Sequence, residues 1–336
     1  MTRATAAGLA RGGAFAAAAL AFPFVFHAAW IVNIGVLTLM YAALATAWNL
    51  FSGYTGYVTL GQIAFFGMGA YALGITFEHF GIGSGYNPFY ALPLVGAGVA
   101  LVSVPVAWVA LRTRHMTFAI VTLTTLFVVQ QLAFNLHSLT KGSTGLMLPT
   151  PSFPIDNYDR PFYLAMLALL LTALALCWLI LRSKLGLMLL AIREDEEKAR
   201  GLGIRVTGAK LIAWSLMVWI TAMVGGVWAY YLTFIYPQSA VDPLVMIGAV
   251  LMTFLGGRGT LWGPTIGALV LVPTQQYMIT KLGASQFYLV GYAAVFMVVL
   301  LVLPRGILPS LRSAIDAMRE RRRTHREPVV REEAHA

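Results

Sequence analysis

The run IGVLTLMYAALATAWNLF (residues 34–51) holds no charged side chain, and the glycine-rich segment GYTGYVTLGQIAFFGMGAY (residues 53–71) follows it almost directly. An apolar run of about 20 residues is long enough to cross a bilayer as a helix. Runs of this kind recur along the 336 residues, of which 59% are hydrophobic and only 11% charged. Soluble domains contain about 45 to 50% apolar residues. The sequence therefore predicts an all-α polytopic membrane protein.

Reading outward from this run gives about ten candidate spans, each bounded by charge, Gly or Pro and each with ends uncertain by several residues. They are Gly12 to Val32, Ile34 to Phe51, Val58 to Phe77, Tyr90 to Leu111, Met116 to Asn135, Phe162 to Leu181, Leu211 to Phe234, Leu244 to Leu255, Gly263 to Ile279 and Phe287 to Leu303. The third run is interrupted by glycines and the eighth is short, so either can be a half-helix or a re-entrant segment. A cleaved signal peptide is the alternative for the first run, but its length of about 20 residues exceeds the usual apolar region of such peptides.

The distribution of Lys and Arg predicts the orientation of the chain. Basic residues precede the first run and then collect after the fourth, sixth and tenth runs, which places all four clusters on one side. Because Lys and Arg collect on the cytoplasmic side, both termini are expected there. The net charge of +10 then reflects orientation and not nucleic-acid binding. We expect a permease domain over residues 1–309 and a basic cytoplasmic tail over residues 310–336, which contacts membrane lipid.

Catalytic, metal and cofactor chemistry have no evident residues in this sequence. The single cysteine, Cys177, cannot form a disulfide within the chain, and the six histidines include no pair at the spacing of a metal site. The phosphate-binding motif G-x-x-x-x-G-K-[ST] does not occur. None of the ten runs contains Asp, Glu, Lys or Arg, which proton-coupled carriers generally need within the membrane. We therefore expect no cofactor on this chain and an energy source on another subunit.

Three segments outside the plain apolar pattern carry the functional hypotheses, and the first is residues 53–71. Its glycines permit a broken helix or close packing of helices. Thr59 and Gln62 are its hydrogen-bonding side chains and the candidate residues of a translocation path. They lie three residues apart and share a face if the segment is helical. The alternative is that they hold neighbouring spans together by hydrogen bonds.

The second segment is GGRGTLWGPTIGA (residues 256–268), which begins with Gly256 and Gly257. Gly259, Gly263 and Gly267 are spaced by four, so they share one face if the segment is helical. Small residues at this spacing favour close packing of helices, which is the interpretation adopted for all five glycines.

The third segment is the cytoplasmic loop at about residues 182–208, with the sequence AIREDEEKARGLGI over residues 191–204. Glu194 with Lys198, and Glu196 with Arg200, form i, i+4 pairs in the favourable acid-first order, which predicts a short helix. Gly201 or Gly203 can end that helix. A solvated surface helix is one interpretation, and a docking element for a cytoplasmic partner is the other.

Together these segments resemble the permease subunits of the high-affinity branched-chain amino-acid ABC importer family, of the LivM type. The family patterns G-x-x-S-L-G-Q with F-x-G-x-G-A-Y, A-I-R-E-[ND]-E…A…L-G-I, and G-G-x-G-[ST]-x-x-G-P-x-x-G-A match residues 56–71, 191–204 and 256–268, and P-x-G-[IL]-L matches residues 304–308. The resemblance covers about residues 33–309. Thr59 stands where the family usually has Ser. Residues 122–127 read TLTTLF where the family commonly reads T-L-G-F-G-E, and residues 140–145 read TKGSTG where it commonly reads T-G-G-x-[ND]-G. These departures leave the solute open.

The resemblance implies a permease in the bacterial inner membrane that works with other subunits. These would be a second permease forming a heterodimer, two cytoplasmic ATPases that hold ATP and Mg, and a periplasmic solute-binding protein. The ATPase-coupling residues would be Ala191, Ile192, Arg193, Glu194, Asp195, Glu196, Ala199, Leu202 and Gly203. The alternative function is a self-sufficient channel or facilitator for a small polar solute such as urea, and a membrane-embedded enzyme is less favoured still.

Overall fold

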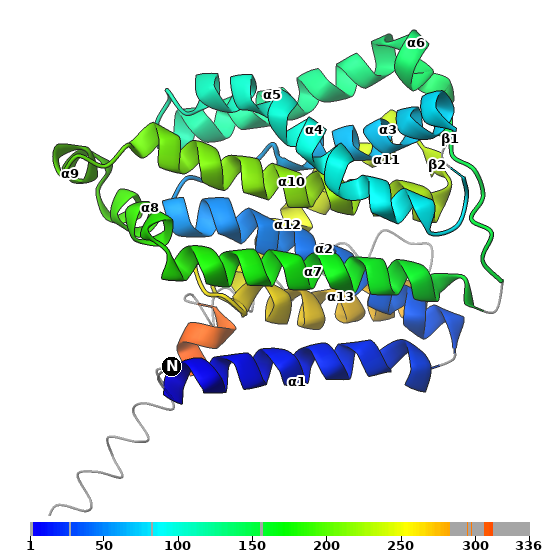
Figure 1. The fold of residues 1–336 in the computed structure, drawn as a ribbon, viewed down its shortest axis with the longest axis horizontal. Helices are drawn as coiled ribbons and strands as arrows, with labels where there is room; N and C mark the ends of the chain where they lie inside the picture. Colours follow the sequence, from blue (N-terminus) through cyan, green and yellow to red (C-terminus); the bar gives the residue numbers. More distant parts are fainter. Residues whose placement is uncertain are drawn as a thin grey trace, which may run out of the picture.

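The computed structural model describes residues 3–26, 28–81, 83–154 and 157–282, and near the C-terminus residues 294, 297 and 306–311. Its helices lie side by side in a bundle, as Figure 1 shows. Six helical stretches in the described part are long and apolar enough to cross a membrane: residues 29–53, 87–110, 115–135, 159–182, 206–232 and 237–256. The all-α membrane class is therefore confirmed, while the count of ten spans and the side on which the termini lie stay predictions.

The elements follow one another along the chain with these bounds. They are α1 (Arg3–Val25), α2 (Ala29–Trp48), the π-helical turn η1 (Asn49–Gly53), α3 (Gln62–Phe80), α4 (Asn87–Ala110), α5 (His115–Asn135), α6 (His137–Thr140), η2 (Gly142–Thr144), β1 (Leu146–Met147), α7 (Asp159–Arg182), α8 (Lys184–Glu194), α9 (Glu196–Gly201), α10 (Val206–Leu232), β2 (Phe234–Ile235), α11 (Pro237–Ala240), α12 (Pro243–Gly256) and α13 (Gly263–Leu282).

Nine of the ten predicted runs lie on these helices, and the boundary between the first two was misplaced. The sequence suggested a break at Asn33, but α2 already begins at Ala29 and contains this residue. A polar side chain is tolerated there because Asn33 Nδ2 donates a hydrogen bond of 2.5 Å to Tyr231 Oη. The tenth run, Phe287 to Leu303, lies outside the described residues except for positions 294 and 297, and the tail lies outside them from residue 312.

The two ends of the bundle differ in what they carry. In Figure 1 the start of α1, α8 and α9 lie at one end, called here the α8–α9 end, and α6, β1 and β2 lie at the other, the β1–β2 end. The strands pair antiparallel, with Leu146 opposite Ile235 and Met147 opposite Phe234. An all-α expectation has no place for this pair, which is only two residues long and joins two loops at the β1–β2 end.

Helix α10 lies at the centre, against α2, α3 and α4. Glycine makes its contact with α3 close: a Cβ on Gly69 would lie 2.1 Å from the Ala222 carbonyl oxygen, and one on Gly225 would lie 2.0 Å from that of Phe66. Small residues let helix backbones approach in this way inside membranes. This packing fixes α3, the helix that follows the break in the chain.

Candidate functional site

The chain between α2 and α3 is not helical, although it lies inside the protein. After the π-helical turn and a short helical stretch, residues 56–61 are irregular, and α3 begins only at Gln62. Side chains satisfy backbone groups that have no partner within a helix. Trp48 Nε1 donates to the Thr59 carbonyl at 2.9 Å, and the Leu60 amide donates to Thr122 Oγ1 at 3.0 Å. Irregular backbone at membrane depth is tolerated only where it is buried in protein or lines a cavity. The sequence had suggested such a break as one interpretation of the glycines.

Thr59 and Gln62 do not share a helix face, because Thr59 precedes α3 and Gln62 is its first residue. Both are buried. Gln62 Nε2 donates to the Leu44 carbonyl of α2 at 3.0 Å and to Thr221 Oγ1 of α10 at 2.8 Å. Gln62 therefore holds spans together, whereas the Thr59 hydroxyl accepts a hydrogen bond from the Gly61 amide of its own segment at 3.3 Å. A role in the translocation path would require that α3 separates from α2 and α10.

The second glycine segment forms a close helix contact and a turn. A Cβ on Gly256 would lie 1.7 Å from the carbonyl oxygen of Gly263, and one on Gly267 would lie 1.8 Å from that of Met252. These glycines therefore lie where α12 and α13 touch. Gly259 was expected on the same helix face, but it lies in the turn between the helices with φ +79°. A helix cannot continue through it, since Gly257 also has a positive φ of +119°.

This turn binds the end of α2 through Asn49. The Gly259 amide donates to Asn49 Oδ1 at 2.7 Å, and Asn49 Nδ2 donates to the Thr260 carbonyl at 2.9 Å. A Cβ on Gly259 would lie 2.4 Å from Arg193 Nη1, so glycine is needed for the approach of the arginine as well as for its φ. Two of the sequence motifs, far apart in the chain, thus meet at the π-helical turn.

Two arginines complete this cluster. Arg193 Nη1 donates to the Gly53 carbonyl at 3.0 Å, and Arg258 Nη2 donates to the carbonyls of Ser52 and Gly56 at 2.9 and 2.8 Å. The last carbonyls of a helix lack partners and carry partial negative charge, so cations stabilise them. We call Asn49, Gly53, Arg193, Arg258 and Gly259 the hub. Sequence reasoning assigned no role to Arg258, although a charge inside a glycine motif was the available signal.

The cytoplasmic loop of the prediction folds as two helices and not one. Asp195 separates α8 from α9 with extended backbone (φ −159°, ψ 107°), and its side chain accepts hydrogen bonds from the amides of Glu197 and Lys198. Asp195 therefore caps α9, and Lys198 pairs with it at 3.2 Å. The predicted Glu194–Lys198 pair is wrong, because a helix break lies between the two residues. The predicted Glu196–Arg200 pair is confirmed at 3.2 Å, and α9 ends at Gly201.

Glu196 points into the protein and joins three elements. It accepts hydrogen bonds from Tyr57 Oη and from Lys210 Nζ, the latter at 2.6 Å, and the Lys210 side chain is only 1% exposed. Burial raises the pKa of the Glu196 carboxyl, but hydrogen bonds from Lys210 and Tyr57 more than offset it, so the pKa lies below its usual value. Lys210 lies in the second turn of the central helix α10, which begins at Val206, and Tyr57 belongs to the irregular segment before α3. Neither partner was predicted.

Of the nine residues predicted to contact the ATPases, five are buried or half-buried and four are exposed. Ile192 and Ala199 are buried, and Ala191, Asp195 and Glu196 are half-buried. Arg193, Glu194, Leu202 and Gly203 are exposed. Leu202 is 82% exposed, and Leu187 of α8, which was not predicted, is 69% exposed. Single exposed apolar side chains are normal on a protein surface, so these leucines mark positions at which docking can be tested and do not establish a contact site.

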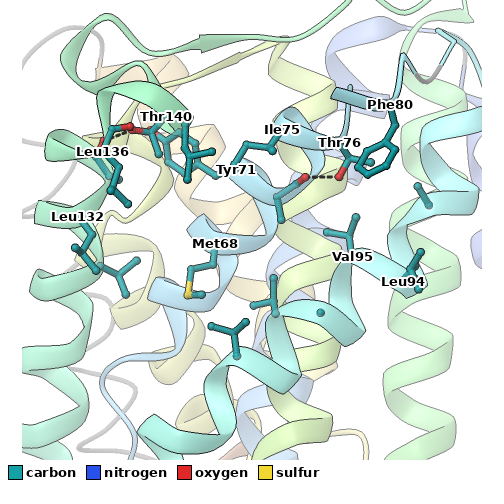
Figure 2. A pocket seen from close by; sticks show the side chains of 18 residues that line it. Met68, Tyr71, Ile75, Thr76, Phe80, Leu94, Val95, Leu132, Leu136 and Thr140 are labelled. Atoms are coloured by element: carbon teal, nitrogen blue, oxygen red, sulfur yellow. Dashed lines mark hydrogen bonds between the residues drawn. The ribbon is translucent and has the colours of Figure 1, made fainter. Parts of the chain in front are cut away.

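An apolar cavity in the described part of the chain offers few groups to a polar solute. It has a volume of 770 Å³ and lies between α3, α4, α5 and α6, with apolar side chains such as Met68, Leu94 and Leu136 around it. Figure 2 shows these side chains and the few hydroxyls among them. Thr76 and Thr140 already bond to backbone carbonyls, and the Tyr71 hydroxyl is the one on this lining without a partner among the described residues. In the described part of the chain, no three His, Cys, Asp or Glu side chains gather as a metal site would require.

Comparison with known proteins decides the family. The family described as the permease component of branched-chain amino acid transport systems matches residues 30–304. This chain belongs to that family. As a member of this permease family with several apolar helices, the protein is a multi-pass protein of the bacterial inner membrane and a transport subunit, not itself an enzyme.

Named relatives agree with the family. The chain is 28% identical over 323 residues to the high-affinity branched-chain amino acid transport system permease proteins LivM of Salmonella typhimurium and of Escherichia coli, which covers 88% of this chain and 73% of each relative. It is 31% identical over 107 residues to the autoinducer 2 import system permease protein LsrC of Photorhabdus laumondii, covering 31% of this chain and 32% of that relative. No solved structure matches this permease.

Proposed function

We propose that this permease is one of two membrane subunits of an ABC importer for branched-chain amino acids or a related small polar solute. The second permease subunit would complete the membrane part, two cytoplasmic ATPases would hold ATP and Mg, and a periplasmic binding protein would deliver the solute. The α8–α9 end and both termini would face the cytoplasm. The names of the LivM and LsrC relatives support an importer with several components.

The observation that carries the proposal is the attachment of α8 and α9 to the break before α3. Arg193, at the end of α8, donates to the Gly53 carbonyl, and Glu196, at the start of α9, binds Tyr57. Gly53 and Tyr57 lie nine and five residues before the start of α3, and Lys210 extends the connection to α10. A displacement of the α8–α9 pair would therefore reach α3 and α10 together through a continuous set of bonds.

This arrangement suggests how ATP would drive the solute across. ATPase closure would push on the exposed residues Glu194, Leu187 and Leu202, and the hub would transmit the displacement to the end of α2 and the start of α3. Gln62, which holds α3 to α2 and α10, would then be the contact that must yield. The solute would leave toward the cytoplasm. The chain itself would bind no cofactor.

Reconstitution tests the proposal against the alternative of a self-sufficient facilitator. Proteoliposomes would contain this chain with the second permease and ATPases, and radiolabelled leucine or urea would be added outside with the binding protein. Uptake that needs enclosed ATP and every subunit supports the importer. Uptake of urea by this chain alone, without ATP, would instead establish the facilitator.

A further inference from the structure

The outward face of α5 is unusual among the apolar helices. Only 22% of the residues in its apolar window are buried, against 28% to 67% for the other five spans of the described part. Beyond its first two residues, which are also exposed, its exposed positions recur at helical spacing and form one face: Thr117, Ile120, Thr124, Phe127, Val128, Gln131, Leu132 and Asn135. A face so little covered by its own chain must meet lipid, another subunit or water.

Polar groups follow this face along its length. Thr117, Thr124 and Gln131 are seven residues apart, which returns almost to the same angle on a helix, and Asn135 lies one turn beyond Gln131. We call these four residues the α5 stripe. Thr124 Oγ1 and Asn135 Nδ2 donate to carbonyls of α5 itself, at 3.0 and 2.8 Å. The side-chain amide of Gln131 makes no hydrogen bond to any residue that the structure describes.

The neighbouring helix α4 gives an internal comparison. From Pro93 to Val109 every exposed residue of α4 is apolar. Leu101 and Val102 are 74% and 59% exposed, as suits contact with acyl chains. A glutamine amide in hydrocarbon has no hydrogen-bonding partner, which is costly. The α4 face therefore fits lipid, whereas the α5 stripe does not at Gln131, the member whose side chain is without a bond to the described residues.

The apolar cavity between α3, α4, α5 and α6, shown in Figure 2, does not account for the stripe. Leu132 of α5 and Leu136, which directly follows α5, line that cavity together with residues of α3 and α4, while the four residues of the α5 stripe do not. The helix thus meets the cavity on one side and, on its other exposed face, alternates the polar side chains of the α5 stripe with the apolar ones of Ile120, Phe127 and Val128. A second surface is needed opposite this face.

We propose that the α5 stripe lines the solute path, at the boundary with the second permease subunit. This inference rests on the importer proposed above. The residues from Met116 to Asn135 include no charged side chain, so this wall of the path would recognise a solute by hydrogen bonds to hydroxyl and amide groups. The exposed ring of Phe127 would contact the apolar part of the solute. Thr124 and Phe127 also lie where the chain departs from the T-L-G-F-G-E pattern.

Cysteine reactivity tests the stripe, with a matched position on α4. Thr124 lies nine residues after His115, the start of α5, and Leu101 lies nine residues before Ala110, the end of α4, so the two are at similar depth. Thr124→Cys, Gln131→Cys and Leu101→Cys would each be made in a Cys177→Ser background and assembled with the other subunits in proteoliposomes. A thiol must ionise to react, which requires water.

The stripe predicts that Thr124→Cys and Gln131→Cys react with a membrane-impermeant thiol reagent at least about tenfold faster than Leu101→Cys, because only they meet water. A transported solute should slow that reaction. Equal rates at the three positions would overturn the inference. The inference would also be overturned if Thr124→Cys and Gln131→Cys did not react with the reagent but could be cross-linked to the second permease, since this would mean a dry helix contact.

Uptake in the same vesicles separates the two proposals. If the Cys177→Ser complex imports solute with ATP while Thr124→Cys and Gln131→Cys stay inert, the stripe fails and the importer stands. If no ATP-dependent uptake occurs with all subunits present, the importer itself fails. Gln131→Leu should raise the KM for solute without changing the stability of the protein. Gln131→Asn keeps a side-chain amide and should bring the KM part of the way back toward that of wild type.

Discussion

Removal of the Glu196 carboxylate should destabilise the protein far more than removal of its neighbour Glu197. Glu196 is 13% exposed and pairs with Lys210, which is 1% exposed, at 2.6 Å. Glu197 pairs with Arg114 at 2.8 Å, but their side chains are 75% and 59% exposed. The two glutamates are adjacent on α9, so Glu196→Gln and Glu197→Gln are matched variants with opposite expectations.

The magnitude follows from the charge that Glu196→Gln leaves behind. Loss of one partner from a buried ion pair costs about 3 to 5 kcal/mol, because the other charge stays buried without compensation. Glu196 retains some exposure, so we expect the lower end, about 3 kcal/mol. Exposed pairs contribute little, since water and salt screen them. Glu197→Gln should therefore leave stability almost unchanged.

Thermal unfolding of the detergent-solubilised protein measures this difference. We expect a clear drop in the midpoint for Glu196→Gln and none for Glu197→Gln. The double variant Glu196→Gln with Lys210→Met should recover much of the loss, because it removes the stranded charge. Equal midpoints for the two single variants would refute the reasoning. The same result limits the use of Glu196 in tests of docking, since reversing its charge would disturb the fold.

Three further outcomes are expected. Gly267→Ala should destabilise the protein by an overpacking cost of about 1 to 3 kcal/mol, because its Cβ would lie 1.8 Å from the Met252 carbonyl oxygen. Gly98→Ala is the control and should leave the unfolding midpoint unchanged, since its Cβ would have nothing within 4 Å. Equal effects of the two variants would mean that α12 and α13 do not touch at Gly267. Hydrogen bonds from the amide and ammonium of Lys198 lower the pKa of the Asp195 carboxyl. The contribution of Asp195 to stability is therefore complete above its usual pKa and is lost as the pH falls through the lowered pKa. Acid should lower the unfolding midpoint of wild type more than that of Asp195→Asn, and parallel pH profiles would contradict the role of Asp195 as a cap. Arg193→Ala should reduce ATP-driven uptake while the ATPases still co-purify, and unchanged uptake would exclude transmission through the hub.

The helices were predictable because hydrophobic runs state where a chain can cross a membrane. Nine runs lie on helices, and the glycines of residues 53–71 left two interpretations open, a break and close packing, both of which the structure contains. The error at Asn33 came from treating a polar residue as a boundary. Its partner, Tyr231, is far away in the sequence, and only the folded structure brings the two together.

The role predicted for the coupling segment stays a prediction, and the structure adds partners that the sequence did not indicate. The α8–α9 segment is helical as expected, but the cap at Asp195 divides it, because an aspartate that binds two amides competes with helix continuation. The roles of Lys210, Tyr57 and Arg258 depend on contacts between segments that no local pattern encodes. Gly259 was assigned to a helix face from its spacing alone, and its positive φ was not visible in the sequence.

The claim that α8 and α9 dock the ATPases has a direct measurement. Leu202→Asp at the α8–α9 end and Leu139→Asp in α6 at the β1–β2 end introduce the same change on exposed leucines, which are 82% and 43% exposed. Each variant would be co-expressed with the second permease and the ATPases, and the ATPase recovered with the membrane subunits would be measured. The account predicts that Leu202→Asp loses the ATPases while Leu139→Asp retains them. Full recovery with Leu202→Asp, or loss with Leu139→Asp alone, would contradict it.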